Sequence, residues 1–185
     1  MGIEMIHQLP KKPTHIFLQA GVGAMAGAMC GFFTDYYGEG VPKIIIVEAD
    51  QADCIYRTAL VDDGELHSVS GVLATMMAGL ACGEPCGIGW QQIRSAARYY
   101  ASVSDTIAAK GMRVLGNPCG QDGRIQSGES GAVTCGLLYE LMRNTKYSEE
   151  RKLLGLDKDA RILCLSTEGA TDLTHYQKVV WDGEE

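Results

Sequence analysis

Three segments of the chain are largely apolar and predict buried strands, and in residues 43–47 the β-branched run is continuous, as in a parallel strand covered on both faces. They are His15–Ala20, Lys43–Val47 and Ala160–Ser166. Segments with helical spacing of apolar residues separate them, and these are long enough for the crossovers that parallel strands require. We therefore predict a three-layer α/β fold, in which helices cover both faces of a mostly parallel sheet.

Apolar residues recur at intervals of three and four between these strands, which predicts helices. The longest early segment runs over residues 22–37 and ends before Gly38. Within it, Gly23, Gly27 and Gly31 form a stripe of small residues that we expect to pack closely against the sheet. Further helices are expected over residues 3–9, 51–59, 72–81, 90–100, 104–110, 130–142 and 172–179, and turns or loops over residues 62–65, 83–87 and 116–128.

The length of 185 residues, with 46% apolar residues, is sufficient for one domain with a substantial core. The formal net charge is −7 and no basic cluster is present, which argues against binding to nucleic acid or to an acidic membrane surface. No apolar stretch reaches the roughly 20 residues that a membrane-spanning helix needs. We expect a cytoplasmic protein.

The seven cysteines are odd in number and scattered, and no signal peptide precedes them. This usage is typical of a reducing compartment, which disfavours a disulfide between Cys54 and Cys82. Cys82 and Cys86 have a spacing seen in zinc sites, but no second pair of cysteines or histidines completes four ligands. We therefore predict no metal site.

The segment Gln-Ala-Gly-Val-Gly-Ala-Met-Ala-Gly at residues 19–27 joins the first predicted strand to a helix. Gly21 and Gly23 leave room for a ligand to approach the backbone, and the helix that follows directs free N–H groups and its positive dipole end toward an anion. The segment therefore predicts a site for a phosphate group.

Three interpretations of this turn remain open on spacing alone. It is a tightly packed junction without a ligand, a dinucleotide site, or a cup for the phosphate of pyridoxal phosphate. Gly21, Gly23 and Ala26 fit the dinucleotide pattern, and Glu48 ends the next strand where a ribose-binding acid would lie. A nicotinamide-dependent oxidoreductase is therefore the alternative enzyme class, and a non-catalytic remnant that binds a phosphate compound is the other alternative.

Several longer motifs favour the third interpretation. Together with residues 19–27 they resemble the pyridoxal-phosphate-dependent lyases of the tryptophan-synthase-β type (fold type II), and in particular the diaminopropionate ammonia-lyases. The order and spacing of the motifs cover nearly the whole chain. They are Met-Ala-Gly-Leu-Ala-Cys-Gly-Glu-Pro (77–85), Gly-Met-Arg-Val-Leu-Gly-Asn-Pro (111–118), Ser-Gly-Glu-Ser-Gly-Ala (127–132) and Ser-Thr-Glu-Gly-Ala-Thr-Asp (166–172).

The resemblance implies pyridoxal 5′-phosphate as the cofactor and an amino acid, 2,3-diaminopropionate, as the substrate, which is converted to pyruvate and ammonia by β-elimination. It also implies a hydroxyl group beside the pyridine nitrogen, for which Ser166, with Thr167 next to it, is the candidate. Ser130 is a weaker candidate that fits equally well as a helix N-cap. The phosphate-binding backbone then comprises Gly21, Val22, Gly23, Ala24 and Met25.

The family resemblance also implies a Schiff-base lysine far upstream of the glycine turn, in an amino-terminal half to which nothing in this sequence corresponds. No lysine of the chain stands where that group is expected, so we assign no catalytic residue. We expect residues 1–185 to be the carboxy-terminal portion of such a lyase, inactive alone, with the complete enzyme a homodimer.

Overall fold

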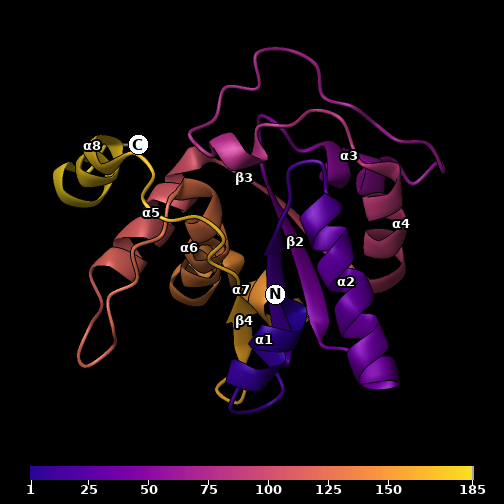
Figure 1. Ribbon diagram of the computed structural model, residues 1–185, viewed down its shortest axis with the longest axis horizontal. Coiled ribbons are helices and arrows are strands. Elements are labelled where there is room, and N and C mark those ends of the chain that lie inside the picture. Colours follow the sequence, from indigo (N-terminus) through magenta and orange to yellow (C-terminus); the bar gives the residue numbers. More distant parts are fainter. Residues whose placement is uncertain (185) are drawn as a thin grey trace.

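The computed structural model describes residues 1–184, in which four parallel strands form an open sheet with the order β3-β2-β1-β4 (Figure 1). In the register of β1 and β2, His15 lies opposite Lys43 and Gln19 opposite Val47, while β4 pairs with the other edge of β1. The predicted parallel α/β architecture is therefore confirmed. The strands are β1 (His15–Gln19), β2 (Lys43–Ala49), β3 (Tyr99–Val103) and β4 (Ile162–Cys164).

Helices connect and flank the strands, and most lie near their predicted positions. Short 3₁₀ turns cover residues 38–40, 78–80 and 145–147, and a π-helical turn covers residues 178–182. The α-helices are α1 (Gly2–Gln8), α2 (Ala24–Tyr37), α3 (Cys54–Val61), α4 (Gly87–Ala96), α5 (Asp105–Gly116), α6 (Glu129–Arg143), α7 (Ser148–Leu154) and α8 (Leu173–Gln177).

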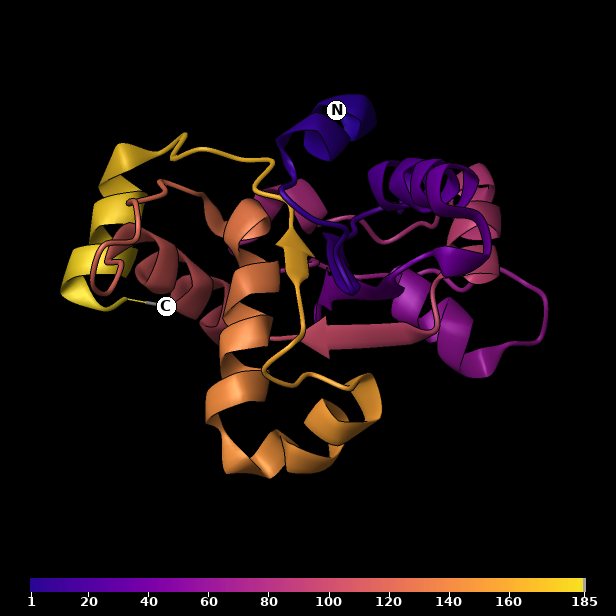
Figure 2. The same ribbon diagram turned by 90° about the horizontal axis from the view of Figure 1, so that it is seen from below.

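Two hydrophobic clusters lie on opposite faces of the sheet, because successive strand residues point to opposite sides. In β2, Ile44 and Ile46 pack on the side of α2 and α4, whereas Ile45 and Val47 pack on the side of α5, α6 and α7. The view in Figure 2 shows these two groups of helices on either side of the strands. This double coverage explains why the strand sequence is continuously apolar.

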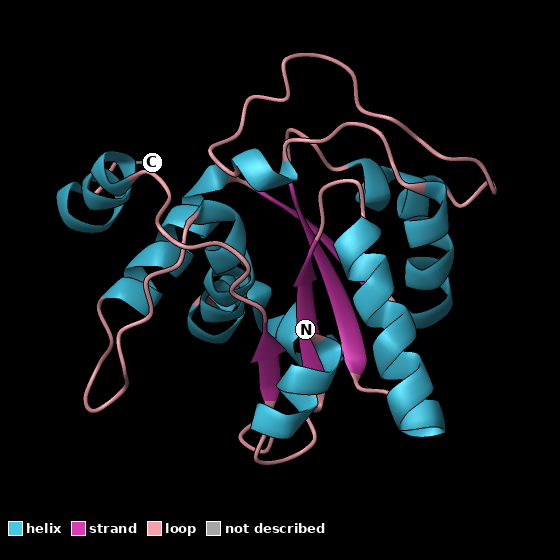
Figure 3. Cartoon of the chain, viewed as in Figure 1, coloured by secondary structure: helices cyan, strands magenta, loops and turns pink. Residues whose placement is uncertain are grey.

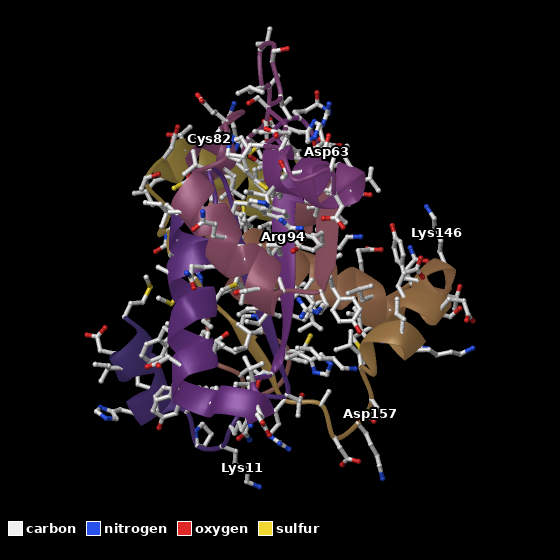
Figure 4. All side chains as sticks on the ribbon, turned by 90° about the vertical axis from the view of Figure 1, so that its right-hand side faces the viewer. Lys11, Asp63, Cys82, Arg94, Lys146 and Asp157 are labelled. Atoms are coloured by element: carbon white, nitrogen blue, oxygen red, sulfur yellow. The ribbon has the colours of Figure 1, made fainter. Side chains whose placement is uncertain are left out.

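The carboxyl ends of the strands meet at one end of the molecule, beneath the long connection between α3 and α4 (Figure 3). Figure 4 places Cys82 and Asp63 at this end and Lys11 and Asp157 at the opposite end. In open parallel sheets ligands bind outside the carboxyl ends of the strands. The fold therefore brings the glycine turn and the connection over residues 62–86 to the expected ligand side.

The helix predicted over residues 72–81 is wrong. Only the three residues Ala78–Leu80 form a 3₁₀ turn, and the rest is an extended loop. Gly71 and Leu73 have φ angles of +126° and +48°, which no right-handed helix accommodates. In addition, the carboxylate of Asp105 accepts hydrogen bonds from the side chain of Thr75 and from Met76 N, so tertiary contacts hold this segment extended.

The helix predicted over residues 90–100 is also partly wrong, because α4 ends at Ala96 and β3 begins at Tyr99. Tyr99 to Val103 pair with residues 45–49 of β2. This edge strand is mostly half-buried and mixes aromatic, small and polar residues, so its pattern alone does not distinguish it from the end of a helix. The polar helix α7 was not predicted, and it buries only Leu154.

The stripe of small residues in α2 packs against α4, not against the sheet as predicted. A Cβ on Gly27 would lie 2.5 Å from Gly89 O, and a Cβ on Gly31 would lie 3.1 Å from the side chain of Gln92. The stripe thus permits a close approach of two helices. The close contact between α2 and α4 fixes the position of the start of α2 relative to the loop that precedes α4.

Candidate functional site

The turn between β1 and α2 presents backbone N–H groups without partners inside the helix. Its N-cap residue, Gly23, has a φ angle of +84° and no side-chain cap. The N–H of Gly27 donates to Gly23 O at 2.8 Å, as the first turn of the helix closes. The N–H groups that precede Gly27 lie at the positive end of the helix dipole, an arrangement that binds anions.

These groups face an open cavity of about 430 Å³. Residues 19–26 form one wall; residues 79, 80 and 82 of the long loop form the second; Ser130, Thr167 and Glu168 form the third. Among the described lining residues there is no lysine or arginine. An anion at the helix start would therefore be held by backbone N–H groups and the helix dipole.

The neighbours of the turn explain why two of its residues are glycines. A Cβ on Gly23 would lie 2.9 Å from Ile55 Cδ1, and its positive φ disfavours any other residue. A Cβ on Gly21 would lie 3.3 Å from Gly79 O. The turn is therefore packed tightly between α3 and the long loop, while its N–H groups stay open to the cavity.

The third wall is fastened by side-chain hydrogen bonds between distant segments. Ser130 Oγ accepts from Gly79 N at 3.2 Å, and Glu168 Oε2 accepts from Ser130 N at 2.8 Å. Glu168 O also accepts from Gly128 N at 3.0 Å. Gly128 is the N-cap of α6, so the interpretation of Ser130 as an N-cap is wrong.

Gln19 joins the glycine turn to the segment that follows β4. Its Nε2 donates to Leu165 O at 2.9 Å and to Thr167 Oγ1 at 2.7 Å. Its Oε1 is buried and has no hydrogen-bond partner among the residues that the structure describes. Buried polar atoms usually have a hydrogen-bond partner, so this oxygen is an unsatisfied acceptor beneath the wall of the cavity.

The structure brings together most of the residues predicted for cofactor binding. Gly21 to Met25 and Thr167 line the cavity. Ser166 is exposed beside it and donates from Oγ to Ser127 Oγ at 2.9 Å. A role for Ser166 or Thr167 at a pyridine nitrogen stays a prediction.

Sequence reasoning missed several contributors to the walls, among them Gln19, Gly79 and Glu168. Each lies inside or beside a motif quoted above, so a signal was present. Gln19 immediately precedes the glycine turn, and Glu168 follows Thr167. Their contacts reach across the fold, however, and local patterns do not indicate them.

Glu48 lies behind the glycine turn and is fully buried. Its oxygens accept hydrogen bonds from Ile55 N at 3.0 Å and Tyr56 N at 2.5 Å. Burial raises the pKa of Glu48 to about 8, although the two backbone N–H groups oppose the shift. A ribose-binding acid must be accessible to its ligand, so this geometry does not support the dinucleotide interpretation.

Cys54 and Cys82, for which the sequence disfavours a disulfide, are both free thiols. Cys54 Sγ lies 3.7 Å from Gly21 O, 3.6 Å from Cys82 O and 3.8 Å from Glu48 Oε1. Burial raises the pKa of Cys54 to about 12, so this thiol stays protonated and acts as a weak donor.

In the described part of the chain, no helix is long and apolar enough to cross a membrane.

A parallel α/β sheet with a glycine turn, and with a helix start without a side-chain cap beside a cavity, has the arrangement by which many α/β proteins bind phosphate groups. The family to which this chain belongs is that of the pyridoxal-phosphate dependent enzymes, whose family model matches residues 1–167.

Within that family the chain is similar to diaminopropionate ammonia-lyases. It is 49% identical over 183 residues to the enzyme of Escherichia coli strain K12, an alignment that covers 99% of this chain and 46% of the relative. It is 47% identical over 188 residues to that of Salmonella typhimurium, again covering 46% of the relative. The chain thus spans about half the length of these relatives.

The crystal structure of the holo diaminopropionate ammonia lyase from Escherichia coli, with selenomethionine incorporated, superposes on this chain with a TM-score of 0.88 at 47% identity. The match covers 98% of this chain and 45% of that one. The predicted family resemblance and fold are thereby confirmed.

Proposed function

We propose that this chain forms the phosphate-binding part of a pyridoxal-phosphate-dependent ammonia-lyase that converts 2,3-diaminopropionate to pyruvate and ammonia. One observation carries the proposal. The start of α2 has glycine, Gly23, as its N-cap residue and therefore no side-chain cap, and it lines an open cavity at the ligand side of the sheet. Family membership and the similarity to diaminopropionate ammonia-lyases support pyridoxal phosphate as the ligand of this cavity.

The residues present fit a phosphorylated pyridine. The N–H groups at the start of α2 suit a single phosphate, and the cavity has the size of small-molecule sites. The hydroxyl of Thr167 adds a polar group to the wall of the same cavity. Gly23 and Gly21 allow the turn to pack against Ile55 and Gly79 while its backbone borders the cavity.

When bound, pyridoxal phosphate supplies an electron-accepting ring for elimination from an amino acid. The task of this chain is to bind and orient. The glycine turn holds the phosphate, and Ser166 or Thr167 offers a neutral hydroxyl to the pyridine nitrogen. A hydroxyl leaves that nitrogen unprotonated, which suits β-elimination. In this proposal the Schiff-base lysine belongs to an amino-terminal portion of the enzyme outside residues 1–185.

Cofactor binding is tested by titrating the chain with pyridoxal 5′-phosphate and with pyridoxal, which lacks the phosphate. We expect the chain to prefer the phosphorylated form. Ala24→Asp should weaken that binding at least about tenfold, because the new carboxylate repels the phosphate and competes for the same N–H groups. Ala24 is exposed at the first position of α2, where an acidic residue is compatible with folding.

Ala28→Asp is the matched control. It introduces the same charge on another exposed position of the same helix, one turn beyond the N–H groups in question. We expect it to bind pyridoxal 5′-phosphate nearly as well as the parent chain. Equal affinity for the two ligands, or equal effects of the two substitutions, would argue against a phosphate site at this turn.

The assignment of the lysine to another segment is tested by activity. The chain loaded with pyridoxal 5′-phosphate and mixed with 2,3-diaminopropionate should form no pyruvate. Cofactor uptake is measured in the same sample, so that lack of turnover is not confused with lack of cofactor. Pyruvate formation would show that the chain contains a working amine.

A further inference from the structure

Glu48 is a fully buried acid that the proposed reaction does not use. It lies near the carboxyl end of β2, and in the described residues it forms no ion pair with a lysine, arginine or histidine. A buried carboxyl group without a cation needs other hydrogen-bond partners, and these define its role. Its hydrogen bonds indicate what that role is.

The carboxyl group of Glu48 serves as a cap for a helix that follows it in the sequence. α3 begins at Cys54, and its own N-cap residue, Asp53, makes no side-chain cap hydrogen bond. Instead, Glu48 Oε1 accepts from Ile55 N and Oε2 accepts from Tyr56 N. A side chain from the strand thereby fixes the first turn of α3 to the end of β2.

The same turn of α3 supports the glycine turn from behind. Ile55 Cδ1 lies 2.9 Å from the position that a Cβ on Gly23 would occupy. Cys54 Sγ lies 3.7 Å from Gly21 O, and also 3.8 Å from Glu48 Oε1. A displacement of the first turn of α3 would therefore change the packing of both Gly21 and Gly23.

We infer that Glu48 is a positioning residue for phosphate binding: by capping α3 it holds Cys54 and Ile55 against Gly21 and Gly23, and so sets the direction of the N–H groups in the cavity. The inference rests on the proposed function, because it assumes that this turn binds the cofactor phosphate. Glu48 itself contacts neither the phosphate nor the substrate.

The test compares the affinities of the full chain and of Glu48→Gln for pyridoxal 5′-phosphate and pyridoxal. Glutamine has nearly the same size, but its amide NH₂ replaces one of the two acceptor oxygens. We expect binding of pyridoxal 5′-phosphate to weaken about tenfold while binding of pyridoxal stays unchanged. A selective loss of this kind distinguishes displacement of the phosphate site from a general loss of structure.

Asp53→Asn is the matched control, because Asp53 is a second buried acid at the same helix start. Its carboxylate accepts hydrogen bonds from Arg57 Nε and Ser102 Oγ, neither of which belongs to the glycine turn. We expect this substitution to leave the preference for the phosphorylated ligand unchanged.

Ile55→Val tests the other end of the contact and covers the case in which Glu48→Gln does not fold. It removes the Cδ1 atom that supports Gly23, and we expect a selective loss of a few-fold for pyridoxal 5′-phosphate. If the parent chain shows no preference for the phosphorylated ligand, the proposed function fails. If it does, but both variants keep the full preference or lose both ligands equally, the role assigned to Glu48 is wrong.

Discussion

The two sides of the cavity are built in different ways. The glycine turn is held by close packing against α3 and α4, with Glu48 fully buried behind it. The opposite wall, at residues 127–130 and 166–168, is held by hydrogen bonds between the start of α6 and the segment after β4, and Ser166 and Thr167 are exposed. In the proposed function the phosphate keeps one position, so a rigid site suits it. The reacting part of a substrate changes shape, which suits a wall of polar side chains.

The largest expected difference between the two sides is in the pH dependence of stability. The pKa of Glu48 is raised to about 8 in the folded chain from 4.5, so the folded state keeps a proton that the unfolded state has lost between these values. Stability therefore falls as the pH rises through this window, by at most about 1.4 kcal/mol per pH unit.

Urea unfolding at several pH values between 5.5 and 8.5 measures this slope. In Glu48→Gln the side chain does not titrate, so the fall with rising pH should be smaller than in the parent chain. If the free energy of unfolding has the same pH slope in the parent chain and in the variant, Glu48 does not hold its proton in the folded state.

The next largest effect should come from the helix contact that positions the glycine turn. Gly27→Ala places a Cβ 2.5 Å from Gly89 O, a backbone atom that cannot move aside without shifting α4. We expect a loss of about 2 kcal/mol in the free energy of unfolding, because overpacking outweighs the better helix propensity of alanine.

Gly31→Ala is the control for this substitution. There the new Cβ would meet only the flexible side chain of Gln92, at 3.1 Å, and stability should change little or increase. Equal stabilities of the two variants would contradict the close α2–α4 contact.

On the opposite wall, Glu168→Gln should cost about 1 kcal/mol in the free energy of unfolding. The substitution removes the carboxylate that accepts from Ser130 N at the start of α6 and complements its dipole. Because the hydrogen bonds that Glu168 accepts in the described residues come from Ser127, Gly128 and Ser130 and not from the glycine turn, the preference for pyridoxal 5′-phosphate over pyridoxal should persist. Loss of that preference would show that the two walls are coupled.

The smallest effect on stability should come from Ser166→Ala, since the side chain is exposed and its hydroxyl bonds only Ser127 among the described residues. We expect a change below about 0.5 kcal/mol. If Ser166 faces the pyridine nitrogen, the absorption spectrum of bound cofactor should shift in this variant. An unchanged spectrum would favour Thr167 for that role.

The amino-acid sequence by itself determined the parts of this protein that depend on local pattern. The buried strands β1 and β2 were predictable because both of their faces are apolar, and the glycine turn because Gly21 and Gly23 recur at a spacing that suits a strand–helix junction. The motif resemblance added the cofactor class. These features depend on residues that are neighbours in the chain.

Only the tertiary structure decided the rest. β3 became a strand because β2 offered it a pairing edge, and residues 72–81 became a loop because Asp105 bonds Thr75 and Met76. The contact of Ser130 with Gly79 and that of Glu168 with Ser130 join residues 51 and 38 positions apart. Hydrogen bonds between such distant groups form only after packing has brought them together, so no local pattern indicates them.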